Sequence, residues 1–277
     1  MLDTPQRHVV FADSLDGAIE ALARGASVMG GGTWMMREER RGEPLPASVV
    51  LLDRIPALTE VVVTDSAVSL GAGLSHAAIA GALKGLPGLE GVVAAASGSA
   101  NPAIRHAATL GGNLATADFP AADLAPALLA QGAEVELAAS GGPRRLSLDA
   151  FLTDRPAHLP DAILTRVHLP REAVRSAHAR LPLRKAGDYP VAIVSIARRA
   201  DSTLRIAVGS VEPVARRWTA LEAAIGARPV SPDEGARLAA AHMDFQGRDG
   251  VEAEGWYRVT VLPALVKRAL DTLEGRP

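Results

Sequence analysis

The sequence of 277 residues contains no cysteine, only three lysines (Lys84, Lys185 and Lys267) and few aromatic residues, which make up 3% of the chain. Without cysteine the chain forms no disulfide framework, no cysteine-ligated zinc site, no cysteine nucleophile and no cysteine-held iron–sulfur cluster. The scarcity of lysine leaves few candidates for a Schiff base or a phosphate-binding lysine. The scarcity of aromatic residues predicts cores that are built mainly from Ala, Val, Leu and Ile.

Charge and hydropathy exclude further classes of protein. The 29 Lys and Arg residues nearly balance the 31 Asp and Glu residues, which argues against a protein built around nucleic-acid binding. Residues 1–17 contain acidic side chains and no apolar core typical of a signal peptide. No run approaches the roughly 20 apolar residues of a membrane span. We therefore expect a soluble, cytoplasmic protein, and at roughly 100–200 residues per domain its length predicts about two globular domains.

Hydrophobic periodicity predicts alternating helices and strands in the first part of the chain. Ser14 and Ser75 are suited to cap helices that stop at Gly25 and Gly85. We expect strands at 26–29, 48–52, 59–63, 67–70, 134–139, 144–148 and 163–169, and a further helix at 123–131. The segment 91–108 is rich in small residues and is interpreted as a helix or loops packed closely against a neighbour, and Gly111-Gly112 is expected to interrupt this region.

Four prolines between residues 155 and 182 mark a change in the sequence pattern, and we place a domain boundary near 172–178. Beyond it the pattern predicts strands at 191–198 and 204–208, followed by amphipathic helices around 218–225, 232–243 and 256–273. The chain contains no internal repeat and no low-complexity tract.

The familiar catalytic motifs are missing. There is no GxxxxGK[ST] phosphate loop, no HExxH and no GxSxG in the sequence. The seven histidines never fall at i and i+4, so each is interpreted as a surface or structural histidine. Carboxylates such as Glu38, Glu39 and Asp188 have no partner that the sequence identifies. We therefore predict no catalytic side chains and no metal ligands in this chain.

The first of two glycine-rich segments, Gly30-Gly31-Gly32-Thr33-Trp34, directly follows a predicted strand. Glycines let backbone N–H groups approach a phosphate without obstruction by Cβ, and successive N–H groups form an anion-binding nest. The segment is not the dinucleotide fingerprint GxGxxG, because Met35 stands at the position of the third glycine. The alternative interpretation is a tight turn between a strand and a helix.

The second glycine-rich segment is 104–115, with the sequence IRHAATLGGNLA. Thr109 offers a hydroxyl, Gly111 and Gly112 offer amides, and Asn113 offers both a donor and an acceptor, a neutral set that suits a diphosphate without lysine. Asp123, ten residues further on, is a potential acceptor for ribityl or ribose hydroxyls. The alternative is a glycine turn between helices, with Asp123 as a simple N-cap. Two such segments without catalytic side chains favour a large phosphate-bearing cofactor that supplies the reactivity.

These segments together resemble the FAD-binding medium subunit of the molybdenum hydroxylases, as in the carbon monoxide dehydrogenase and xanthine dehydrogenase families. The likeness covers nearly the whole chain in order, and its most specific element is the TxGGN pattern that follows Ile104-Arg105. It is carried by residues 31–33, 50–58, 104–115, 123–130, 132–135, 184–189 and 256–270.

The resemblance implies an α+β protein. Residues 1–172 would form a PCMH-type, vanillyl-alcohol-oxidase-like FAD-binding domain with lobes at about 1–57 and 58–172, and residues 176–277 a smaller C-terminal α+β domain. FAD would lie between the lobes, with its pyrophosphate against the two glycine-rich loops. The residues that the resemblance assigns to FAD are Gly30, Gly31, Gly32, Thr33, Trp34, Thr109, Gly111, Gly112, Asn113, Asp123, Lys185 and Tyr189. The resemblance also implies a contact with the cofactor near Ile55 or near Ile163, without deciding between them.

In function, the resemblance implies an electron-relaying flavoprotein subunit of an oxidoreductase complex. Electrons would pass from two [2Fe–2S] clusters on a small subunit through FAD to NAD+, oxygen, a quinone or another acceptor, while a large subunit with molybdenum–molybdopterin handles the substrate. The complex would be a heterotrimer or its dimer. The alternatives are a stand-alone flavin reductase of the same fold and a scaffold subunit that has lost its cofactor.

The sequence departs from the family pattern at three places. Trp34 stands where the family usually has a small polar residue, and Pro102 and His106 replace the more usual polar residue and Asn around Ile104-Arg105. We therefore expect the first loop to pack differently or to shield the flavin, and we do not assign His106 to the cofactor.

Overall fold

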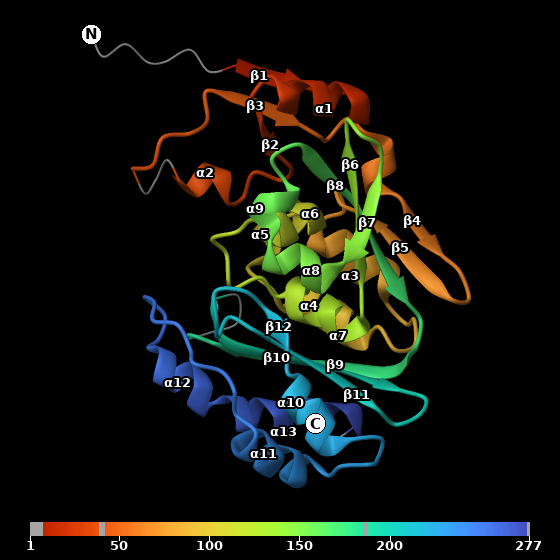
Figure 1. Ribbon diagram of the computed structural model, residues 1–277, viewed down its shortest axis with the longest axis vertical. Helices are drawn as coiled ribbons and strands as arrows, with labels where there is room; N and C mark the ends of the chain where they lie inside the picture. Colours follow the sequence, from red (N-terminus) through yellow and green to blue (C-terminus); the bar gives the residue numbers. More distant parts are fainter. Residues whose placement is uncertain (1–7, 39–41, 185–187, 276–277) are drawn as a thin grey trace.

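The computed structural model describes residues 8–38, 42–184 and 188–275, which form a mixed α/β protein built around three β-sheets (Figure 1). The sheets follow one another along the chain, and each has its own helices and its own hydrophobic core. No helix in the described residues is both long enough and apolar enough to cross a membrane.

The N-terminal sheet is parallel, has the order β1-β3-β2, and is built from β1 (His8–Phe11), β2 (Ser27–Met29) and β3 (Ser48–Leu51). Helix α1 (Leu15–Ala23) crosses between β1 and β2, and the short helix α2 (Met35–Glu38) follows β2. The Ser14 hydroxyl accepts a hydrogen bond from the Gly17 amide at 3.1 Å, and Gly25 ends the helix with a left-handed φ of 88°. Both signals are local, and the predicted cap and stop are confirmed.

The central sheet is antiparallel and has the order β4-β5-β8-β6-β7, with its longest strand in the middle. Its strands are β4 (Val61–Val63), β5 (Ala67–Gly71), β6 (Glu134–Ala139), β7 (Arg144–Ser147) and β8 (Ala162–Pro170). A 3-10 helix, η2 (Pro56–Thr59), leads into it. The helices of this unit are α3 (His76–Leu83), α4 (Glu90–Gly98), α5 (Pro102–Ala107), α6 (Leu110–Ala115), α7 (Leu124–Gln131), α8 (Leu148–Thr153) and α9 (Arg155–His158).

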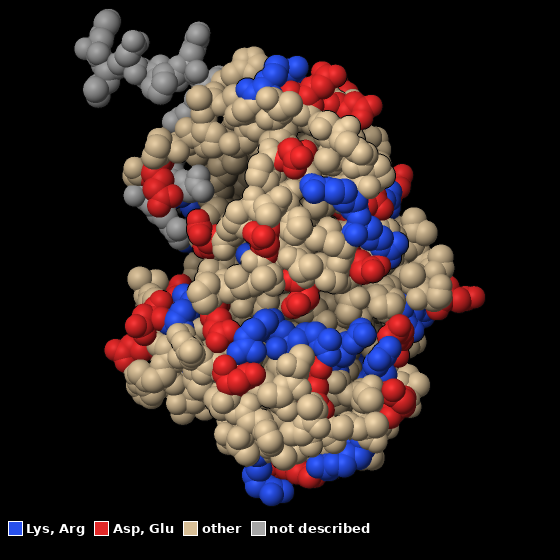
Figure 2. Space-filling view, viewed as in Figure 1, with Lys and Arg blue, Asp and Glu red and all other residues tan. Residues whose placement is uncertain are grey.

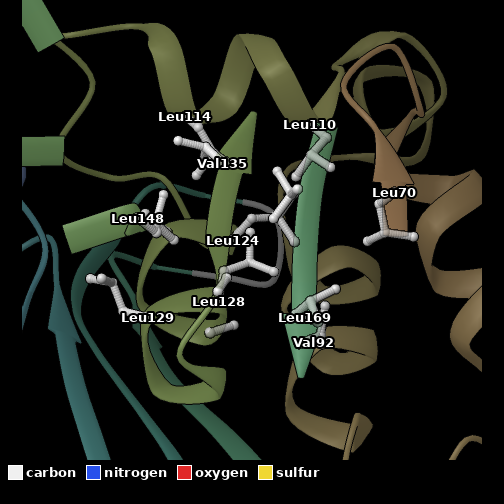
Figure 3. Packing of buried hydrophobic residues seen from close by; sticks show 14 of the residues in the cluster. Leu70, Val92, Leu110, Leu114, Leu124, Leu128, Leu129, Val135, Leu148 and Leu169 are labelled. Carbon is white, nitrogen blue, oxygen red and sulfur yellow. The ribbon is translucent and has the colours of Figure 1, made fainter. Parts of the chain in front are cut away.

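Leucine, valine and alanine side chains fill the space between the central sheet and its helices (Figure 3). Leu70, Val135 and Leu169 from three strands belong to one buried cluster with leucines of α6 and α7, and in Figure 3 Leu169 lies beside Val92 of α4. Phe151 is the only aromatic residue among the fully buried members of this cluster. The predicted aromatic-poor core is confirmed. Burying this apolar surface stabilises the fold by roughly 25 cal/mol per Å², and it fixes the N-terminal end of α7, next to Asp123.

The C-terminal sheet is antiparallel with the order β12-β11-β10-β9. Its strands are β9 (Ala173–Pro182), β10 (Pro190–Arg199), β11 (Leu204–Gly209) and β12 (Arg216–Arg217). Helices α4 and α7 cover one face, and the other carries α10 (Thr219–Ile225) and α13 (Leu262–Leu273). Helix α11 (Pro232–Ala241) packs on α13, and α12 (Gly255–Thr260) lies beside them (Figure 1). Because both faces are covered, residues 190–197 of β10 are buried without interruption.

Residues 173–182 form the ten-residue strand β9, which was not among the predicted strands. Two local predictions are wrong. Gly111-Gly112 does not interrupt a helix but lies inside α6. The single helix expected at 256–273 is divided into α12 and α13, because Pro263 sits at the start of the second helix and cannot continue the first. The division of the chain at 172 and 176, with two lobes before it, stays a prediction.

Candidate functional site

A cavity of about 1050 Å³ lies where the three units meet, and Figure 2 shows the surface hollowed beside α2. Its walls come from residues within 28–37 of the N-terminal unit, within 99–123 of the central unit, and within 180–184, 188–189 and 251–252 of the C-terminal unit, together with His76. This volume is slightly larger than the range usual for small-molecule sites, about 300–1,000 Å³.

The first glycine-rich loop connects β2 with α2 and packs directly against the second. A Cβ on Gly31 would fall 1.6 Å from the carbonyl oxygen of Ala107, and one on Gly30 would fall 2.7 Å from Oγ1 of Thr109. Only glycine permits this approach. Within the described residues, the amides of Gly31, Gly32 and Thr33 make no hydrogen bond, so these three donors remain available to a ligand.

The second glycine-rich segment forms the start of α6. Thr109 is the N-cap, and its Oγ1 accepts a hydrogen bond from the Gly112 amide at 3.1 Å. The Gly111 amide donates to the carbonyl oxygen of Ala72 at 2.7 Å, and Gly111 is not among the residues that line the cavity. The amides that the sequence offered to a diphosphate are therefore used inside the chain, and the donors left for a ligand lie in the first loop.

Two buried side chains in the cavity wall each have a polar atom that makes no hydrogen bond with the described residues. Asn113 is 8% exposed, and its Oδ1 has no hydrogen-bond partner among the described residues. His76 is 3% exposed, its Nδ1 lies 2.7 Å from Oγ of Ser99, and its Nε2 likewise has no partner there. The pKa of His76 is lowered to about 4, chiefly by burial; the charge of Asp123 opposes this shift and that of Arg105 adds to it. His76 is therefore neutral near pH 7.

Arg105, in the second glycine-rich segment, stabilises the turn between α4 and α5. Nη1 of Arg105 donates to the carbonyl oxygens of Ser99 at 3.0 Å and Ala100 at 2.7 Å. Ala100 adopts a left-handed φ of 45°, which is unfavourable for a residue with a side chain. Arg105 thus stabilises a strained turn that contributes Ser99, Ala100 and Asn101 to the cavity wall.

Asp123 joins the central unit to the C-terminal sheet. Its Oδ1 accepts from Nε of Arg180 at 2.8 Å and lies 3.4 Å from Nε2 of His178, whose Nδ1 is 2.9 Å from Oγ of Ser195. Nη2 of Arg180 also donates to the backbone carbonyl of Asp188 at 2.8 Å. Although Asp123 is the N-cap residue of α7, its side chain makes no capping hydrogen bond. The simple N-cap interpretation is therefore wrong.

An aromatic cluster lines the cavity on the side of α2. The ring of Phe119 lies 4.9 Å from Trp34 and 5.7 Å from Tyr189, centroid to centroid. The guanidinium of Arg37 lies 5.7 Å from the Trp34 ring and 5.1 Å from the Tyr189 ring. Trp34, the departure from the family pattern, therefore packs into a cluster that spans the N-terminal, central and C-terminal units.

Most of the predicted cofactor residues lie in this one cavity. Those that line it are Gly30, Gly31, Gly32, Thr33, Trp34, Thr109, Gly112, Asn113, Asp123 and Tyr189. Lys185 lies outside the described residues. Ile55 and Ile163 are buried in the core of the N-terminal unit and do not line the cavity.

Sequence reasoning missed several lining residues, among them His76, Ser99, Arg37, Phe119 and Arg180. Each belongs to the site through a partner distant in sequence, and no motif marks it. Asp188, for which the sequence named no partner, forms an ion pair with Arg184 at 3.2 Å. No group of three or more His, Cys, Asp or Glu residues in the described part of the chain could hold a metal ion.

The comparison with family models identifies residues 5–172 as an FAD binding domain in molybdopterin dehydrogenase. Over 280 aligned residues, 96% of this chain and 94% of the relative, the chain is 30% identical to the 6-hydroxypseudooxynicotine dehydrogenase complex subunit alpha of Paenarthrobacter nicotinovorans. It is 27% identical to the nicotine 6-hydroxylase medium subunit of the same organism, over 81% of each chain.

Among solved structures, the fold is similar to that of the carbon monoxide dehydrogenase from Hydrogenophaga pseudoflava. The TM-score is 0.86, with 23% identity over 98% of each chain. A chain of quinoline 2-oxidoreductase from Pseudomonas putida 86 gives a TM-score of 0.84 with 22% identity over 99% of each chain. The protein belongs to the family of FAD-binding subunits of molybdopterin dehydrogenases, and the resemblance found in the sequence is confirmed.

The cavity fits FAD, the cofactor of this family. The three unused amides of the first loop suit a diphosphate, because backbone N–H groups are the usual ligands of phosphate oxygens where lysine is lacking. The unpartnered Oδ1 of Asn113 requires a donor that none of the described residues supplies. The cavity volume is that of a large ligand. The residues present are therefore compatible with the cofactor.

Proposed function

We propose that this chain is the FAD-holding, electron-relaying subunit of a molybdenum hydroxylase complex. The observation that carries the proposal is that two glycine-rich segments, Asp123 and Tyr189, separated widely in sequence, line one large cavity. Family membership supports the same conclusion. We further propose that residues 1–172 form the two-lobed PCMH-type domain and that residues 176–277 form the smaller domain.

In this proposal the diphosphate of FAD lies against the loop of Gly30, Gly31, Gly32, Thr33 and Trp34 and close to Thr109 and Gly112 at the start of α6, whereas Oδ1 of Asn113 accepts a hydrogen bond from the cofactor. Asp123 accepts a hydrogen bond from a cofactor hydroxyl, and Lys185 and Tyr189 lie near the flavin. Gly111 acts indirectly, by allowing α6 to approach Ala72. When bound, FAD supplies the redox chemistry, accepting electrons from the complex and delivering them to an external acceptor.

The chain's own residues exclude water and fix the orientation of the ligand. Phe119, Trp34 and Tyr189 provide an apolar wall, and Arg180 holds the Asp123 carboxylate by a hydrogen bond from Nε to Oδ1. His76 is not suited to act as a general acid or base near neutral pH, since burial lowers its pKa to about 4.

The substrate centre and the remaining redox centres then belong to other chains. Because this chain has no cysteine, two [2Fe–2S] clusters would have to be held by a small subunit. Molybdenum–molybdopterin would be held by a large subunit. The names of the relatives, a medium subunit and a subunit of a dehydrogenase complex, support such an assembly, a heterotrimer or its dimer.

The proposal is tested by purifying the full chain alone and together with its co-purifying partners. We expect one FAD per chain, measured by absorbance and by release on denaturation, and iron and molybdenum only in the complex. A matched pair of variants locates the site. Gly31→Ala should lose FAD because its Cβ collides with Ala107, whereas Gly81→Ala, whose Cβ meets open space in α3, should retain it.

Chain and complex that both lack flavin would refute the proposal and favour a scaffold subunit. A monomer that binds FAD and turns over a substrate without partners would favour the stand-alone reductase. Equal flavin content in the Gly31 and Gly81 variants would show that FAD binds elsewhere.

A further inference from the structure

His76 and Ser99 form a buried pair in the cavity wall that no family motif marks. His76 is the first residue of α3, and Ser99 is the residue at which α4 ends. They are 3% and 4% exposed, both line the cavity, and Nδ1 of His76 lies 2.7 Å from Oγ of Ser99. The pair lies beside the second glycine-rich segment, since the His76 amide donates to the carbonyl oxygen of Ala108 at 3.0 Å.

One tautomer of His76 satisfies both hydrogen bonds of Ser99. In it the Ser99 hydroxyl donates its only hydrogen to the carbonyl oxygen of Ala96 at 3.2 Å. Nδ1 of His76 then carries the proton and donates to the serine oxygen at 2.7 Å. The imidazole is neutral near pH 7, because burial lowers its pKa to about 4. In this tautomer Nε2 is an unprotonated acceptor.

No described residue donates a hydrogen bond to this acceptor, and the charged groups nearby are not placed to do so. Nε2 of His76 and Oδ1 of Asn113 are both buried and without a partner. The nearby charged groups are Asp123, whose carboxylate can only accept, and Arg105, whose Nη1 is bonded to two carbonyl oxygens. The buried polar atoms left without a partner in this part of the wall are therefore acceptors, whereas the loop of Gly31 contributes amide donors.

We propose that His76 is a further cofactor-binding residue, which accepts at Nε2 a hydrogen bond from a hydroxyl of the cofactor's ribityl chain or ribose. Ser99 is a positioning residue that holds the required tautomer. The inference rests on the proposed FAD site and specifies which part of the ligand meets this wall. Hydroxyls match it because each can donate to one acceptor, and several acceptors lie in the same wall. A phosphate does not, because its oxygens only accept at neutral pH.

The first test measures ligand affinity of the full chain and of His76→Phe, His76→Gln and the control His106→Gln. His106 is exposed and does not line the cavity. Since a lost neutral hydrogen bond corresponds to a factor of about ten, we expect roughly tenfold weaker FAD binding for His76→Phe. His76→Gln, which keeps an acceptor near the position of Nε2, should recover part of the affinity, and the control should match the wild type.

Truncated ligands distinguish the two sources of the hydroxyl. If His76→Phe weakens the binding of riboflavin but not that of ADP, the hydroxyl belongs to the ribityl chain. If it weakens the binding of ADP but not that of riboflavin, the hydroxyl belongs to the ribose. An equal affinity of wild type and His76→Phe for FAD would overturn the inference while leaving the FAD site intact. A wild-type chain that binds no FAD would overturn both.

The second test does not depend on the folding of a variant. In ¹⁵N-histidine-labelled wild-type protein, saturation with FAD should shift the Nε2 resonance of His76 toward that of a hydrogen-bonded acceptor. Ser99→Ala should mix the two tautomers in the free protein. A His76 spectrum that FAD leaves unchanged, or that shows a protonated Nε2 in the wild type, contradicts the proposal.

Discussion

The depressed pKa of His76 predicts a specific dependence of stability on pH. In the unfolded chain the imidazole titrates near 6.5, whereas burial lowers its pKa in the folded chain to about 4. Between these values the unfolded state binds a proton that the folded state does not. The free energy of unfolding therefore decreases as the pH falls from about 6.5 to about 4, and the stability contributed by neutral His76 is complete only above that window.

The magnitude follows from the shift. One pKa unit corresponds to about 1.4 kcal/mol, so a shift of this size removes about 3 kcal/mol of stability by pH 4 relative to neutral pH. The value applies to a side chain that is almost wholly buried and is not reduced by solvent screening. It is a large part of the roughly 5–15 kcal/mol by which a domain is usually stable.

The assay is urea unfolding of the FAD-free chain at pH 7.0, 5.5 and 4.5, followed by circular dichroism. His76→Gln is the variant and His106→Gln is the control, because His106 is exposed. The difference in unfolding free energy between wild type and His76→Gln should become less favourable to the wild type by about 2.5 kcal/mol between pH 7.0 and pH 4.5, while the control follows the wild type. Parallel curves for wild type and His76→Gln would refute the reasoning about burial.

Three further predictions concern the two glycine-rich segments. Gly31→Ala should destabilise the chain by about 1–3 kcal/mol in urea unfolding, because its Cβ meets a backbone oxygen. The control Gly81→Ala in α3 should stabilise the chain by up to about 1 kcal/mol. Equal effects of the two substitutions would contradict the close approach of the loops. Thr109→Ala should lower the melting temperature through the loss of about 1 kcal/mol of capping, and Thr109→Ser should restore it. Arg105→Gln should cost about 2 kcal/mol and increase proteolysis at the turn after α4, since two carbonyl oxygens lose a charged donor; unchanged proteolysis would argue against that role.

Features controlled by neighbouring residues in sequence were predictable. The caps at Ser14 and Ser75, and the glycine stops after them, depend on interactions over three or four residues. The antiparallel pairing of 134–139 with 144–148 follows from alternation and a short turn, and β6 and β7 confirm it. The family could be identified because its binding loops are continuous motifs.

Features that depend on distant partners were not predictable. Strand β9 was missed because its alternate residues Ser176, His178 and Arg180 are polar, and they are polar because they contact Glu90, Ser195 and Asp123 from other elements. Helix α6 was missed because glycine is a poor helix former, and the helix is held by backbone bonds to Ala72 and Leu74 instead. The sequence gives no sign of the role of His76, because its partner Ser99 lies 23 residues away.

The distribution of hydrogen-bonding groups in the cavity links cofactor loading to the stability of the fold. In the free chain the buried Nε2 of His76 and Oδ1 of Asn113 have no described partner, and an unmade buried hydrogen bond costs about 1–3 kcal/mol. A ligand that donates to both removes this cost only in the folded state, so FAD should stabilise the chain beyond the effect of filling the cavity. The gain should be smaller for His76→Phe, because the unsatisfied acceptor is absent from both the free and the bound protein. A thermal shift with FAD that is the same for wild type and His76→Phe would mean that His76 contributes to the fold alone.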